Sequence, residues 1–149
     1  MKSIAIVIPN GHFSLTNAEA SFQMFNWVNG YCISQGRNAP FTVSYVGEHE
    51  TVHDATGKFS IHVDATYENA PSPDLIILPA IHGDQHANLT HNVALANWMQ
   101  NEAASGTEIA GFCVGAFFLA GTGLLEGRSC STHWLYAADF RAALPEVDL

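Results

Sequence analysis

Positive charge is scarce in this sequence. Lysine and arginine account for only five of the 149 residues, against 14 aspartates and glutamates, which leaves a net charge of −9. The five basic residues are scattered and form no cluster: Lys2, Arg37, Lys58, Arg128 and Arg141. Because phosphate binding needs clustered positive charge, this pattern excludes a segment that binds nucleic acid by itself.

Long apolar runs and paired cysteines are also missing. No apolar stretch approaches the roughly 20 residues that a membrane span requires, so we expect no membrane partner. The run at 4–8 is too short for a signal peptide, and no small-residue cleavage site follows it. Cys32, Cys113 and Cys130 are an odd number without close spacing, which favours reduced thiols in the cytoplasm over a disulfide framework.

The sequence does contain enough apolar material for the core of one domain. Hydrophobic residues make up 48% of the chain and charged residues 13%. Apolar runs predict strands at 4–8, 41–46, 74–79, 109–112 and 130–132. Periodicity predicts helices at 18–35, 92–105, 114–125 and 134–144. We also expect a hairpin around 55–57 and a polar loop at 80–88.

Alternating strands and helices predict an α/β fold with an open, mostly parallel, doubly wound sheet of the flavodoxin-like kind. Ligands of such folds bind outside the carboxyl ends of the strands. The loops after Ile8 and Leu78, and the turn at Cys113, would open at that edge. We therefore expect a ligand site there.

The most informative motif is Gly111-Phe112-Cys113-Val114-Gly115, between a predicted strand and a predicted helix. A nucleophile elbow has this form, because residues flanking so tight a turn must be small. A thiol at a helix N-terminus lies where backbone N–H groups favour the thiolate. His133 follows the next short predicted strand, and its imidazole would then lie near the thiol. On spacing alone, a buried small residue and an unrelated histidine explain the pair slightly better, because no third catalytic partner is visible.

The helix predicted at 18–35 has two apolar stripes. One stripe consists of Phe22, Phe25, Val28 and Cys32, and the other of Met24, Trp27 and Tyr31. Two stripes indicate a helix that is covered on more than one side. The second stripe either packs under a neighbouring element or forms a homodimer surface.

Three histidines, His82, His86 and His91, lie close together with Asp84 between the first two. Imidazole and carboxylate groups can bind divalent metals. Gly83 and the polar neighbours favour a solvated loop instead, so we expect neither a metal nor another cofactor.

Four segments resemble the ThiJ/PfpI, class I glutamine amidotransferase-like superfamily: Pro79-Ala80-Ile81-His82-Gly83-Asp84, 109–120, Gly123-Leu124-Leu125-Glu126-Gly127-Arg128 and Ser131-Thr132-His133-Trp134. Within it, the sequence is most similar to the N-terminal domain of AraC-family transcriptional regulators. The resemblance implies that residues 1–149 form a sensing domain truncated at its C-terminus, with an AraC-type helix-turn-helix domain downstream. It also implies a small-molecule effector, a homodimer, and DNA binding only through the downstream domain.

The resemblance assigns roles to individual residues. Cys113 is the nucleophile or redox-sensitive thiol, and His133 is its neighbour. The N–H groups of Val114 and of the Ile81-His82-Gly83 loop would form an anion-binding hole. Enzymatic members place an acid at the position of Asn17, and Glu19 lies two residues further on.

Asn17 therefore favours a catalytically degenerate ligand site, formed by Asn17, Ile81, His82, Gly83, Cys113, Val114 and His133. Two alternatives stay open. One is a hydrolase, hydratase or glyoxalase-like enzyme that uses Cys113 and His133. The other is a redox sensor that depends on Cys113.

Overall fold

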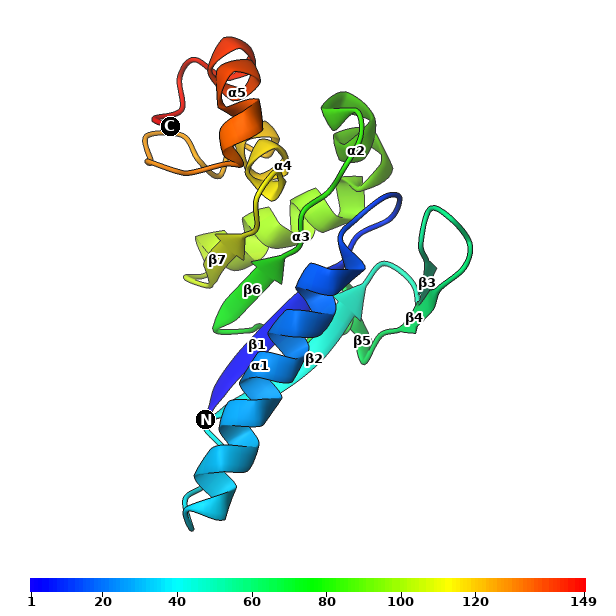
Figure 1. Ribbon diagram of the computed structural model, residues 1–149, viewed down its shortest axis with the longest axis vertical. Helices are drawn as coiled ribbons and strands as arrows, with labels where there is room; N and C mark the ends of the chain where they lie inside the picture. Colours follow the sequence, from blue (N-terminus) through cyan, green and yellow to red (C-terminus); the bar gives the residue numbers. More distant parts are fainter.

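The computed structural model describes residues 1–149, which form a five-stranded parallel sheet between helical layers (Figure 1). The strand order is β5-β2-β1-β6-β7, and every pair in it is parallel. The strands are β1 (Lys2–Ile8), β2 (Phe41–Gly47), β5 (Ala65–Thr66), β6 (Leu75–Leu78) and β7 (Glu108–Gly111). The predicted open, doubly wound α/β sheet is confirmed.

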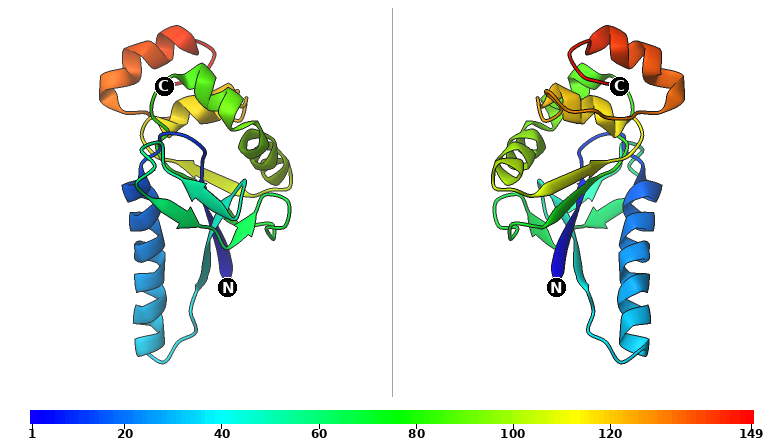
Figure 2. Two further views of the ribbon diagram at one scale, coloured as in Figure 1. Left: turned by 90° about the vertical axis from the view of Figure 1, so that its right-hand side faces the viewer. Right: turned by 90° about the vertical axis from the view of Figure 1, so that its left-hand side faces the viewer.

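The helices lie on both faces of the sheet and above its carboxyl edge. Helix α1 (Leu15–Ser34) covers one face and α3 (Val93–Ala104) the other (Figure 2). Helices α2 (Gln85–His91), α4 (Gly115–Gly121) and α5 (Ala137–Ala143) lie beyond the carboxyl ends of the strands, and the short 3₁₀ helix η1 (Trp134–Tyr136) precedes α5. No helix is both long and apolar enough to cross a membrane.

The continuous apolar run of β1 follows from this layering. Ile4, Ile6 and Ile8 belong to the buried cluster on the α1 face, whereas Ala5 and Val7 belong to the cluster that contains α3. A central strand that is covered on both faces needs apolar side chains at every position. A third buried cluster joins α4 and α5, where Phe117 meets Phe140 edge to face with ring centroids 4.8 Å apart.

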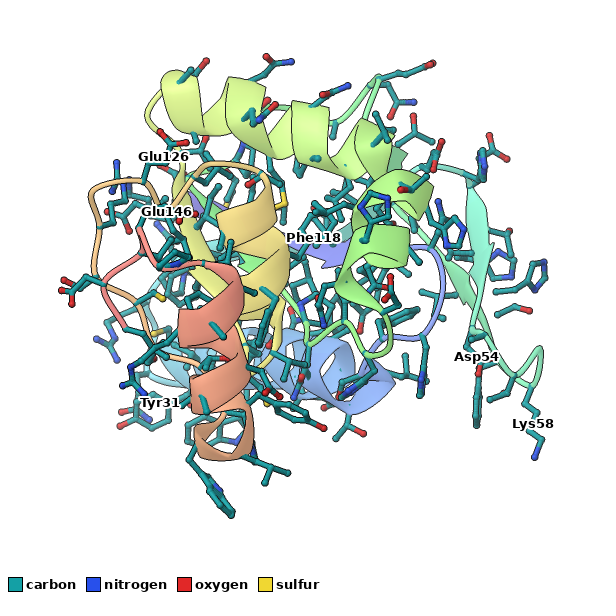
Figure 3. The ribbon with its side chains drawn as sticks, turned by 90° about the horizontal axis from the view of Figure 1, so that it is seen from above. Tyr31, Asp54, Lys58, Phe118, Glu126 and Glu146 are labelled. Carbon is teal, nitrogen blue, oxygen red and sulfur yellow. The ribbon has the colours of Figure 1, made fainter.

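A two-stranded hairpin projects from the body of the protein. It pairs β3 (Thr51–His53) with β4 (Ser60–His62) in antiparallel register, as predicted. Asp54 and Lys58, at its end, lie away from the centre that Phe118 occupies (Figure 3). The two-residue strand β5 was not predicted, because two residues show no periodicity.

The polar loop predicted at 80–88 is wrong in its second half. Helix α2 begins at Gln85, because the Asp84 carboxylate accepts a hydrogen bond of 2.7 Å from the Ala87 N–H. Asn92 lies directly before α3, but its side chain does not cap the helix. Its buried amide instead accepts from the Asn10 N–H at 2.7 Å and donates to the Asn10 and Asn88 carbonyls.

The C-terminal third also differs from the prediction in three places. The helix predicted at 114–125 ends at Gly121, and the one predicted at 134–144 is divided into η1 and α5. The strand predicted at 130–132 is absent. The Cys130 N–H donates to the Asp148 carbonyl at 2.8 Å, so this segment pairs with the end of the chain through one isolated bridge rather than with the sheet.

Candidate functional site

Cys113 lies at the sharp turn between β7 and α4. It is the one non-glycine residue with a positive φ, 54°, a backbone conformation that side chains with a Cβ rarely adopt. The two flanking glycines leave little space for a side chain. A Cβ on Gly111 would lie 2.7 Å from Leu119 Cδ1, and a Cβ on Gly115 would lie 3.0 Å from the Pro79 carbonyl oxygen. The structure thus explains why the motif has glycine on both sides.

The backbone around the thiol has unused donors. Cys113 is exposed and its thiol is free. The Gly115 N–H donates to the Phe112 carbonyl at 2.8 Å, whereas the Cys113 and Val114 N–H groups have no acceptor within the protein. Two adjacent free N–H groups can hold an anion or a developing oxyanion.

The structure brings the segment of His133 to Cys113 through Thr132. The Thr132 hydroxyl donates to the Cys113 carbonyl at 3.1 Å. The His133 imidazole is occupied within its own turn: Nδ1 accepts from the Leu135 N–H at 3.2 Å, and the ring lies 5.7 Å from that of Trp134. No hydrogen bond joins the imidazole to the thiol.

Asn17 lies in the first turn of α1 and is bound to the loop that follows β6. Its Oδ1 accepts a hydrogen bond of 3.2 Å from the Ala80 N–H. Glu19 points to other partners, accepting from Gln23 Nε2 at 2.7 Å and from the Tyr45 hydroxyl at 2.9 Å. These two hydrogen bonds lower the pKa of Glu19. Neither side chain is hydrogen-bonded to the thiol.

The loop Ile81-His82-Gly83 supplies fewer donors than predicted. The His82 N–H donates to the His12 carbonyl at 2.7 Å, so it is not available to an anion. The N–H groups of Ile81 and Gly83 have no protein acceptor. The His12 and His82 rings lie 5.2 Å apart, a pairing that the sequence did not reveal because the two residues are far apart along the chain.

A hollow of about 210 Å³ adjoins this edge of the sheet. It is lined by His82, Gly83, Gln85, Val114, Phe117, Tyr136 and Asp139. Three of these were predicted, and Gln85, Phe117, Tyr136 and Asp139 were not, because no motif marks them. Gln85 Oε1 is buried without a hydrogen-bond partner. Asn17, Ile81, Cys113 and His133 do not line the hollow.

A larger hollow of about 480 Å³ lies at the opposite, amino end of the sheet, around the ion pair of Lys2 and Asp74. Ligands of open α/β sheets bind at the carboxyl ends of the strands. We therefore take the smaller hollow beside Cys113 as the candidate site. No group of three histidine, cysteine or acidic side chains in the structure is arranged to hold a metal ion.

Comparison with known proteins identifies the family from the sequence, and the solved structures share the fold. The DJ-1/PfpI family profile matches residues 5–147. The HTH-type transcriptional regulator GbdR of Pseudomonas aeruginosa is 33% identical over 93 residues, which are 62% of this chain and 24% of the regulator. Isonitrile hydratase of Pseudomonas putida is 30% identical over 71 residues, which are 48% of this chain and 30% of the enzyme.

The crystal structure of an AraC family transcriptional regulator from Pseudomonas putida has the same fold. The TM-score is 0.69 at 19% sequence identity, over 99% of this chain and 75% of that one. The segment that matches GbdR by sequence covers about a quarter of that regulator's length.

Proposed function

The chain belongs to the DJ-1/PfpI family, and from this membership we propose that it is the ligand-sensing and dimerisation domain of an AraC-type, DNA-binding transcriptional regulator. Its similarity to GbdR and its shared fold with an AraC family regulator support this role. In the proposal, residues 1–149 sense the effector and a helix-turn-helix domain downstream binds DNA. The net charge of −9 agrees with this division of labour.

The effector would bind between the Cys113 turn and the loop after β6. We assign to this site the predicted residues Asn17, Ile81, His82, Gly83, Cys113, Val114 and His133, together with the newly found Gln85, Tyr136 and Asp139. The free N–H groups of Cys113 and Val114 would hold an anionic group of the ligand. A hollow of about 210 Å³ limits the ligand to a small metabolite.

We propose that the cysteine site is catalytically degenerate, and the amide of Asn17 is the observation that carries this. An amide cannot exchange a proton with a thiol. Here it ties α1 to the Ala80 N–H, and the nearby Glu19 is held by Gln23 and Tyr45. The thiol therefore stands at its turn without a carboxylic acid hydrogen-bonded to it.

Ligand binding can act on an attached domain only if the ligand binds one conformation more tightly than another. The hollow joins residues of the loop after β6 to residues of η1 and α5. A ligand that bridges these segments would favour the conformation in which they are close. An effector would therefore change the position of α5 relative to the loop after β6.

The test has two steps. Small metabolites are screened for those that raise the melting temperature of the chain, and binding of a hit is then measured by calorimetry. The double variant Cys113→Ala/His133→Ala is expected to bind at least tenfold more weakly, and Cys32→Ala, distant on α1, serves as the control. Equal affinity of the double variant and the wild type would contradict the site.

A second candidate function is a cysteine-dependent hydratase. The positive φ of Cys113 favours it, because strained backbone conformations of this kind concentrate at active sites. The similarity to isonitrile hydratase names one reaction to test. Water would add to an alkyl isonitrile and give the N-alkyl formamide, with the thiolate attacking the terminal carbon and then leaving. Formation of formamide by the wild type but not by Cys113→Ala would establish this function and exclude the degenerate site.

A further inference from the structure

One face of the β3–β4 hairpin carries two histidines and two hydroxyls. Successive residues of a strand alternate between its faces, so Thr51 and His53 of β3 share a face with Ser60 and His62 of β4. Both histidines and Ser60 are exposed. The opposite face packs against the buried cluster beside α1 through Val52, which is 3% exposed. The hairpin is thus anchored on one side and presents its imidazoles on the other.

His53 and His62 are diagonal neighbours on this face. The Val63 N–H donates to the Glu50 carbonyl at 3.1 Å, directly beyond the pair of Thr51 and His62. That pair is therefore of the non-hydrogen-bonded type, in which facing side chains lie closest, and the pair that contains His53, two residues further along, is of the same type. Diagonal neighbours are about 7–8 Å apart, with their Cβ atoms somewhat closer, which is within reach of two imidazole rings.

Each imidazole is held by a hydroxyl of the opposite strand. Ser60 Oγ lies 2.9 Å from His53 Nδ1, and Thr51 Oγ1 lies 3.0 Å from His62 Nδ1. When Nδ1 carries the ring proton, it donates to the hydroxyl oxygen and Nε2 keeps its lone pair. Metal-binding histidines are held in this manner, because an acceptor for one ring nitrogen fixes both the tautomer and the orientation of the other.

The charges around the hairpin favour a cation. Residues 48–64 contain four carboxylates and one base: Glu48, Glu50, Asp54, Asp64 and Lys58. In a chain with a net charge of −9, such a segment attracts positive ions and repels anions. A phosphate or sulfate group is therefore a poor ligand for this pair of imidazoles.

We propose that His53 and His62 bind one zinc ion through their Nε2 atoms. Imidazole is a preferred ligand of zinc and of the neighbouring late transition metals. No third protein ligand is in place, so water would complete the coordination. The hairpin lies away from the turn between β7 and α4 (Figure 1), which makes this site separate from the proposed effector site. The sequence does not indicate the pair, because nine residues separate the two histidines, and the expectation of no metal considers only the histidines at 82–91.

NMR of the imidazole nitrogens tests the proposal on the whole chain, with isotopically labelled histidine and zinc chloride as the only addition. His53→Gln and His62→Gln identify the two signals. In the metal-free chain we expect both rings to carry their proton on Nδ1. As zinc is added, both Nε2 signals should shift together, at zinc concentrations at least about tenfold lower than those that shift His49. His49 is exposed and precedes the same hairpin, outside its ladder.

The variants separate metal binding from folding. Each glutamine variant leaves one imidazole and is expected to bind zinc at least about tenfold more weakly at that ring, because the second ligand is lost. Thr51→Val keeps both histidines but removes the hydroxyl that positions the His62 ring, and it should weaken binding about tenfold. His49→Gln is the matched control and should bind zinc like the wild type. Circular dichroism confirms that each variant is folded.

Each outcome decides the question. A joint shift of His53 and His62 ahead of His49, lost in both glutamine variants, would support the site. Shifts of all three histidines over one range of zinc concentration would overturn it, because they indicate independent surface imidazoles. A shift of only one member of the pair would overturn it as well. A metal-free spectrum with the ring protons on Nε2 would contradict the orientation on which the site depends.

Discussion

At Cys113, backbone geometry and packing together fix an exposed thiol in place. The residue has a positive φ, and a Cβ on either flanking glycine would press against Leu119 or Pro79. The neighbouring N–H groups stay free as a result of the same turn. A turn held this firmly presents the thiol and its donors whether or not the protein performs chemistry with them.

Replacing Gly115 with alanine is expected to lower the free energy of unfolding by about 1–3 kcal/mol. The new Cβ would lie 3.0 Å from a backbone oxygen, Pro79 O, which has little freedom to move. Gly30→Ala is the control: its site in α1 has nothing within 4 Å of the new atom, and alanine there should stabilise the helix by about 0.5–1 kcal/mol. Urea unfolding measures both, and equal effects would refute the steric explanation.

The thiols of Cys113 and Cys130 should differ in their rates of alkylation. Cys113 is exposed, whereas burial and the nearby Asp148 carboxylate raise the pKa of the Cys130 thiol. Because the thiolate is the reacting form, a raised pKa leaves less of it at neutral pH. We expect iodoacetamide at pH 7.5 to modify Cys113 several-fold faster than Cys130, as followed by peptide mass spectrometry. Equal rates would show that the environments of the two thiols do not differ in solution.

At the scale of elements, the segment after β6 shows how one side chain changes a prediction. Gly83 and its polar neighbours indicate a loop, yet the Asp84 carboxylate satisfies the Ala87 N–H and starts α2 one residue later. The helix then carries Gln85 to the hollow beside Val114. A capping interaction thus contributes to the shape of the candidate site.

Asp84→Ala is expected to destabilise the protein by about 1 kcal/mol, because the Ala87 N–H loses its acceptor. Asp84→Asn keeps a side-chain oxygen that can cap the helix and should cost much less. Thermal or urea unfolding of both variants gives the comparison. If asparagine were as damaging as alanine, the charge of Asp84 rather than its capping bond would be the cause.

At the scale of the whole molecule, the acidic charge and the exposed α1 face act together. A net charge of −9 repels nucleic acid and other copies of the chain alike. The uncharged stripe from Met24 to Tyr31 is the part of the surface on which that repulsion has least effect. In the proposed regulator, this would direct the domain toward pairing and leave DNA to another domain.

The isolated 149-residue chain should therefore not bind duplex DNA, even at low salt, where electrostatic binding is strongest. Fluorescence anisotropy of a labelled duplex at 20 mM salt is the measurement, with a known basic DNA-binding domain as the positive control. Binding that weakens with added salt would mean that Lys2, Arg37, Lys58, Arg128 and Arg141 form a phosphate site despite their spacing.

The sequence by itself determined the fold class, the positions of the main strands along the chain and the turn at Cys113. Buried parallel strands need unbroken apolar runs, and a tight strand-to-helix turn needs glycine, so both leave marks that can be read locally. The strand expected at 130–132 could not be read in this way, because the Cys130 N–H pairs with Asp148 near the end of the chain.

Only the tertiary structure decided which groups share the candidate site. The Asn17 amide reaches Ala80, the His12 and His82 rings meet, and Thr132 rather than His133 bonds to Cys113. It also decided that the stripe through Trp27 faces outward. Contacts between segments depend on how helices and loops are placed over the sheet, and no local pattern of residues encodes that placement.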